Sequence, residues 1–71
     1  MRVNMSDQDQ VELRLRIARL ELEHEDYGHA IDAMTAQGVD ALTIQRFKKK
    51  KLALKDEIAK LKIRTIPDII A

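Results

Sequence analysis

The chain has 71 residues, a net charge of +1 and no cysteine. A chain of this length forms one small domain, which is marginally stable without disulfides, a metal or self-association. The absence of cysteine excludes disulfides, thiolate metal sites and a cysteine nucleophile. No apolar run approaches the roughly 18 residues that span a bilayer, and the start lacks the apolar core of a signal peptide. We therefore expect a cytoplasmic protein with no membrane span.

The first predicted element is a helix over residues 7–36, preceded by a start at 1–6 that we expect to be disordered. Ser6 and, three residues later, Asp9 resemble a capping box, in which the hydroxyl accepts a hydrogen bond from a backbone N–H of the first turn. Side chains that recur at steps of three and four residues then lie along one line of the helix, here called the seam. The seam positions are Leu13, Ile17, Leu20, His24, Tyr27, Ile31 and Met34.

One residue of this helix is unfavourable: a glycine at position 28 costs about 1 kcal/mol relative to alanine. We interpret Gly28 as a tolerated defect, with a close helix contact or a bend as the alternatives. A turn follows at residues 37–40. There Gly38 is free to adopt the left-handed conformation that is common just past a helix end.

The second predicted helix covers residues 41–64, with Asp40 as its N-cap. It repeats the same spacing before Pro67, which forces the preceding residue out of the helical conformation. Its seam positions are Ile44, Phe47, Lys51, Leu54, Ile58 and Leu61. An apolar tail at 65–71 completes the chain. We expect it to dock within the protein's own assembly, with docking on another protein as the alternative.

Two such helices predict an all-α fold, an antiparallel two-helix hairpin of coiled-coil type, as a single domain over residues 1–71. Folding the chain about residue 39 produces layers in which, for example, Ile17 meets Leu61. The flanking charges leave this register open to a slip of one heptad. Glu21 near Lys55 supports the register, whereas Glu23 opposite Glu57 argues against it. We interpret the polar seam residues as groups that fix register at some cost in stability. A pH-sensing or ligand role for the seam histidine is the alternative.

A second apolar stripe lies opposite the seam of the first helix. Val11, Leu15, Ala18 and Leu22 follow steps of four and three residues, and a two-helix hairpin cannot cover this face. Exposed apolar stripes usually mark a partner surface. We therefore predict a homo-oligomer, a dimer or tetramer that forms a helical bundle, with Val11, Leu15 and Leu22 in the contact. Scattered surface residues and a different protein partner are the alternatives. On the second helix, the residues Leu52, Ala59 and Ile63 also lie off the seam.

Charge divides unevenly along the chain. Residues 1–40 hold four basic and nine acidic side chains, whereas residues 41–71 hold nine basic and three acidic ones. We interpret this as an acidic helix lying against a basic one. The alternative is that Lys48, Lys55 and Lys62, which share one side of the second helix, contact an anionic partner such as nucleic acid. Such contacts would be salt-sensitive and tolerant of sequence.

Nothing in the sequence points to catalysis. His24 and His29 are five residues apart, which is not the i, i+4 spacing of a zinc helix. The carboxylates lie on helix faces with no cleft to shift their pKa values. We expect no enzyme activity, no metal and no cofactor.

Three segments resemble the YdcH-like family of small bacterial proteins of unknown function. They are Glu23-His24 with Ile31 seven residues on, the lysine-rich run from Phe47 to Ile58, and the tail from Ile66 to Ala71. The run is the most specific part, with its Leu-x-Leu-Lys-Asp-Glu-Ile ending. Tyr27-Gly28 departs from the Leu-Asp expected of the family. The resemblance implies a short cytoplasmic helical hairpin and supplies no activity.

Overall fold

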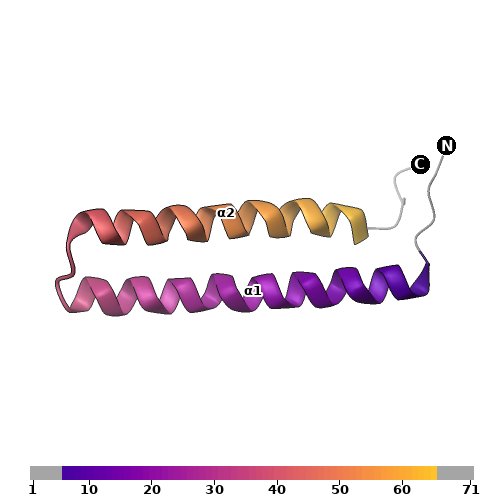
Figure 1. The fold of residues 1–71 in the computed structure, drawn as a ribbon, viewed down its shortest axis with the longest axis horizontal. Coiled ribbons are helices and arrows are strands. Elements are labelled where there is room, and N and C mark those ends of the chain that lie inside the picture. The colour runs from indigo at the N-terminus through magenta and orange to yellow at the C-terminus, as the bar shows by residue number, and fades with distance from the viewer. Residues whose placement is uncertain (1–5, 66–71) are drawn as a thin grey trace.

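The protein is a hairpin of two antiparallel helices lying side by side (Figure 1). The structure, a computed structural model, describes residues 6–65. Helix α1 covers Asp7–Ala36 and helix α2 covers Ala41–Thr65. The predicted all-α hairpin is therefore confirmed, and α2 ends one residue beyond the expected position. Of the start expected at 1–6 and the apolar tail expected at 65–71, residues 1–5 and 66–71 lie outside the described range. Ser6 is the ordered cap of α1 rather than part of a disordered start, and Thr65 is the last residue of α2.

Both helices begin at capping residues that the sequence predicts. The Asp9 backbone N–H donates to the Ser6 hydroxyl at 3.0 Å. At α2, the Thr43 backbone N–H donates to Asp40 Oδ1 at 3.0 Å, and the Thr43 hydroxyl donates to Oδ2 at 3.2 Å. The two bonds from backbone N–H groups satisfy donors that have no partner within the first turn of a helix.

The turn between the helices depends on Gly38, whose φ of 73° is the left-handed conformation expected from the sequence. The Gly38 N–H donates to the Thr35 carbonyl at 3.2 Å, and the Val39 N–H donates to the Met34 carbonyl at 3.0 Å. This pair of bonds is the Schellman motif, which ends a helix by satisfying its last carbonyls. The motif and the Asp40 cap together reverse the chain in four residues.

The core consists of seam residues from both helices. Leu13, Ile17, Ile31, Ile58 and Leu61 are 7–9% exposed. All of them except Ile31 form one cluster, against which Leu20 packs. A cluster that joins Leu13 and Ile17 to Ile58 and Leu61 corresponds to the register in which Ile17 is level with Leu61. It lies at the open end of the hairpin, away from the turn.

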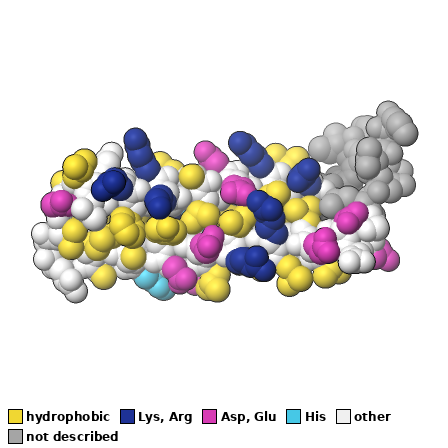
Figure 2. Space-filling view, viewed as in Figure 1, with side chains coloured by type: hydrophobic (Ala, Val, Ile, Leu, Met, Phe, Trp, Pro, Cys, Tyr) yellow, Lys and Arg dark blue, Asp and Glu magenta, His cyan; other side chains and the backbone are white. Residues whose placement is uncertain are grey.

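The hairpin is a single layer, because its extents are 52 × 21 × 14 Å and a helix with its side chains is about 10–12 Å thick. Among the described residues, each helix therefore has a neighbour on one side only. Figure 2 shows the result on one face, where a hydrophobic band follows the boundary between the helices and charged side chains of both signs border it. No helix within residues 6–65 is long and apolar enough to cross a membrane.

Ion pairs join the two helices within residues 6–65. Arg16 pairs with Glu57 at 2.7 Å and Lys62 pairs with Glu21 at 2.9 Å. The partners differ from those expected, since Glu21 binds Lys62 rather than Lys55. Glu57, expected to face Glu23, is neutralised by Arg16. Long exposed side chains can reach several neighbours. The register, which sets the position of each residue along the hairpin, therefore does not by itself determine which charged residues pair.

Candidate functional site

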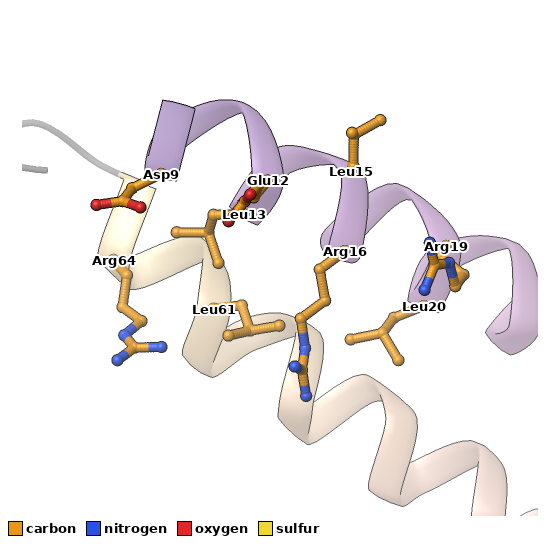
Figure 3. Close-up of a pocket in the computed structure, with 9 residues that line it drawn as sticks. All are labelled: Asp9, Glu12, Leu13, Leu15, Arg16, Arg19, Leu20, Leu61 and Arg64. Atoms are coloured by element: carbon orange, nitrogen blue, oxygen red, sulfur yellow. The ribbon is translucent and has the colours of Figure 1, made fainter. Parts of the chain in front are cut away.

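The second stripe of α1 faces solvent along its whole length. Its large side chains Val11, Leu15 and Leu22 are 55%, 60% and 59% exposed. Figure 3 shows Leu15 pointing away from α2, whereas Leu13 and Leu20 on the same helix point toward it. The α1 stripe (Val11, Leu15, Ala18, Leu22) is thus an apolar surface that the hairpin does not cover.

Helix α2 carries a corresponding set, here called the α2 patch: Leu52, Ala59 and Ile63. Its large members Leu52 and Ile63 are 61% and 70% exposed. Leu42, near the turn, is 71% exposed, and the sequence reasoning did not single it out. The sequence could have identified Leu42 as exposed, because its position in the heptad places it on the side of α2 away from the seam. Large exposed apolar side chains therefore occur on the outer sides of both helices.

A groove on one side of the seam gathers lysines from α2; we call it the lysine groove. Its lining residues are Glu21, His24, Ile31, Asp32, Lys48, Lys51, Leu52, Lys55 and Ile58. Lys48 and Lys55, both candidates for anion contact, therefore line one groove together with Lys51. The third candidate, Lys62, pairs with Glu21 instead. The groove has a partly apolar floor, and its acidic members reduce its positive charge.

Gly28 lies where the side chain of Lys51 crosses α1. A β-carbon placed on Gly28 would lie 3.5 Å from Lys51 Nζ and 3.7 Å from Lys51 Cε. These are ordinary van der Waals separations, so the glycine allows a close contact without being required by it. The half-buried His24 lines the same side.

A second groove, at the open end, lies over the core cluster. Figure 3 shows Leu13 and Leu61 between the helices, with Arg16 and Arg64 extending beside them. Arg19 also lines this groove, with Asp9 and Glu12 as its acidic members. The sequence reasoning missed this grouping, because its basic members come from different helices and form no run.

One carboxylate has a shifted pKa, and it lies outside both grooves, at the start of α2. Hydrogen bonds from the side chain and then the backbone of Thr43 lower the pKa of Asp40 below its ordinary value of 3.8. This shift belongs to the α2 cap rather than to a reactive site. Within residues 6–65, no group of three or more His, Cys, Asp and Glu side chains is placed to hold a metal ion.

The fold and these surfaces define a small helical hairpin with exposed apolar stripes and an uneven charge. The family model described as "Protein of unknown function (DUF465)" matches residues 17–62, and the chain belongs to this family. The match agrees with the YdcH-like resemblance, and it covers most of both helices, including Leu22 and the lysine groove. No curated protein and no solved structure matches the chain.

Proposed function

We propose that the protein is a small, non-enzymatic interaction or scaffold module of the cytoplasm that self-associates through the α1 stripe. The observation that supports this is the exposure of Val11, Leu15 and Leu22, at 55–60%, along one line of α1. Because the hairpin is a single layer, no other described element covers that line. Burial of one leucine side chain contributes about 1.5–3 kcal/mol, and a chain of this size has little other stability to draw on.

The test is the light-scattering mass of the wild type and of Leu15→Glu across a concentration series. We expect a wild-type dimer or tetramer and an at least roughly tenfold weaker association for Leu15→Glu, since about 1.4 kcal/mol changes an equilibrium constant tenfold. Glutamate is nearly as good a helix former as leucine, so the hairpin itself should persist, which circular dichroism checks. A wild type that stays monomeric at every concentration overturns the proposal.

Leu42→Glu is the matched control. It introduces the same chemical change at an exposed leucine, 71% accessible, that lies outside the α1 stripe. It should leave the mass unchanged. Equal weakening by both variants would mean that added negative charge, and not loss of the stripe, opposes association.

A second candidate is binding to nucleic acid phosphates, which is favoured by the grouping of Lys48, Lys51 and Lys55 in one groove. Three phosphate contacts would give a slope of log K against log salt of roughly −2 to −3. Fluorescence anisotropy with labelled duplex DNA over a salt series measures this slope. Lys48→Glu should weaken the binding and flatten the slope. Absence of binding at low salt removes this candidate and leaves self-association untouched.

A further inference from the structure

Charged side chains border the α1 stripe along both of its edges. Glu12 and Arg19, seven residues apart, follow one edge, and Arg14 and Glu21, also seven apart, follow the other. Glu12 and Glu21 are separated by about two and a half helical turns, which places them on opposite sides of α1. The grooves agree with this, because Glu12 and Arg19 line the groove at the open end whereas Glu21 lines the lysine groove. All four side chains are exposed.

The remaining arginine of this segment does not border the stripe. Arg16 bonds to Glu57 of α2 at 2.7 Å, so it reaches toward the seam. Each edge of the stripe therefore carries one acidic and one basic residue. Their order differs between the edges, because the acid comes first in the pair Glu12 and Arg19, and the base comes first on the other edge.

This order makes the stripe complementary to itself in one orientation. When a second copy packs its stripe face to face and antiparallel, a two-fold axis relates the copies, and each edge lies beside the same edge of the second copy in reversed order. Glu12 then lies beside Arg19 of the second copy. Arg14 likewise lies beside Glu21 of the second copy, and the two-fold axis repeats both contacts. Glu21 also bonds to Lys62 at 2.9 Å, and a carboxylate can accept hydrogen bonds from more than one donor.

The same alignment matches the apolar residues over the whole stripe. Leu15 is level with Ala18 of the second copy, and Val11 is level with Leu22 of the second copy. The three large members of the stripe are 55–60% exposed in the hairpin, so this contact covers surface that the hairpin leaves open. A shift by one heptad in either direction reduces the apolar overlap. It also sets identical residues of an edge, and therefore like charges, against each other.

A parallel contact between two stripes is unfavourable for the same reason. Two stripes that pack face to face and parallel bring each edge beside the opposite edge, with the residues in the same order. Arg14 then lies beside Arg19 of the second copy, and Asp7 lies beside Glu12 of the second copy. Both contacts oppose like charges.

We infer that the α1 stripe of one copy binds the α1 stripe of a second copy in the antiparallel orientation, which forms a two-fold symmetric dimer. This inference rests on the proposed self-association and adds the orientation and the register. Charged residues that border an apolar stripe commonly set both in paired helices. Because the stripe lies opposite the seam, the α2 helices lie on the outer sides of the dimer. Its charged contacts are Glu12–Arg19 and Arg14–Glu21, each formed twice.

Charge exchange at positions 12 and 19 tests this arrangement. In Glu12→Arg, two arginines face each other twice in the dimer, and in Arg19→Glu two glutamates do. We expect each variant alone to associate at least roughly tenfold more weakly than the wild type, measured as light-scattering mass across a concentration series. An equimolar mixture of the two variants should return to wild-type strength, since both contacts of the mixed dimer join an acid to a base. The double variant Glu12→Arg/Arg19→Glu should also associate like the wild type.

Arg46→Glu is the matched control. It changes the net charge by the same amount as Arg19→Glu, at an exposed position of α2. It should associate like the wild type, and its mixture with Glu12→Arg should stay weaker than the mixture of Glu12→Arg with Arg19→Glu. Arginine and glutamate are both good helix formers, so circular dichroism should show the same helix content in every variant.

The outcomes separate the inference from the proposal it rests on. A wild type that is monomeric at every concentration overturns both. A wild-type oligomer that both single variants strengthen indicates parallel stripes, because each substitution would then place an acid beside a base; it overturns the inference and keeps self-association. A wild-type oligomer that neither variant changes, or that the mixture and the double variant fail to restore, also overturns the inference, because positions 12 and 19 would then not face each other.

Discussion

Replacing Gly28 by alanine should stabilise the hairpin. A glycine in the middle of a helix costs about 0.8–1 kcal/mol relative to alanine. The new methyl group would lie 3.5 Å from Lys51 Nζ and 3.7 Å from Cε, so no atom has to move. Partial loss of water around the ammonium subtracts a few tenths of a kcal/mol. We expect a net gain of about 0.5–1 kcal/mol, which for a chain of this size raises the Tm by roughly 2–8 °C.

Urea and thermal unfolding followed by far-UV circular dichroism measure this change. The protein concentration must be fixed, because self-association would itself shift the Tm. Gly38→Ala is the control of opposite sign. Its φ of 73° is left-handed and costs alanine about 1–2 kcal/mol, although a β-carbon there would meet nothing within 4 Å. A destabilised Gly28→Ala would show that Lys51 needs the space, and the reasoning would be wrong.

Three further changes test the core, the cap and an ion pair. Leu61→Ala truncates a residue that is 8% exposed and should cost about 2–5 kcal/mol in urea unfolding; a loss under about 1 kcal/mol contradicts the core assignment. Because the pKa of Asp40 is lowered below 3.8, its stabilising effect is complete above that pH and is lost as the pH falls through the lowered value. The difference in stability between wild type and Asp40→Asn should therefore shrink below pH 3.8, and a constant difference would refute this. An alanine double-mutant cycle on Arg16 and Glu57 should give a coupling of about 0.2–1 kcal/mol that weakens with added salt, and a salt-independent coupling would contradict its exposed character.

The fold was predictable because burial and backbone geometry leave few choices. The steps of three and four residues identified all five side chains that are buried within residues 6–65, including Ile31 at 7% exposure. The capping role of Asp40 and the left-handed Gly38 followed from properties of single residues. These features depend on interactions between residues that are close in the sequence, so they can be predicted from it.

The charge contacts were less predictable. Glu21 has both Lys55 and Lys62 on the facing side of α2, and it pairs with Lys62. The side chains of Glu21 and Lys62 are 48% and 54% exposed, and an exposed pair is worth only about 0–1 kcal/mol, so patterning does not select one partner. Likewise, the sequence left three explanations for Gly28, and only the structure shows that the end of the Lys51 side chain lies beside it at ordinary van der Waals distance. The candidate surfaces were predictable as exposed stripes. Their positions relative to each other along the hairpin were not, because these depend on the register between the two helices.

The position of the core cluster has a consequence for how the hairpin comes apart. Isolated helix ends fray, and the open end of a hairpin is where separation would ordinarily begin. Here the cluster of Leu13, Ile17, Ile58 and Leu61 lies at that end. In the unfolded chain, bringing Ile17 and Ile58 together closes a long loop. The entropy lost on closing a loop grows only slowly with its length, so this distance in sequence adds little to the cost of forming the cluster. Separation from the free end must therefore first break the cluster that holds four of the five buried side chains within residues 6–65, so the two helices should unfold as one cooperative unit.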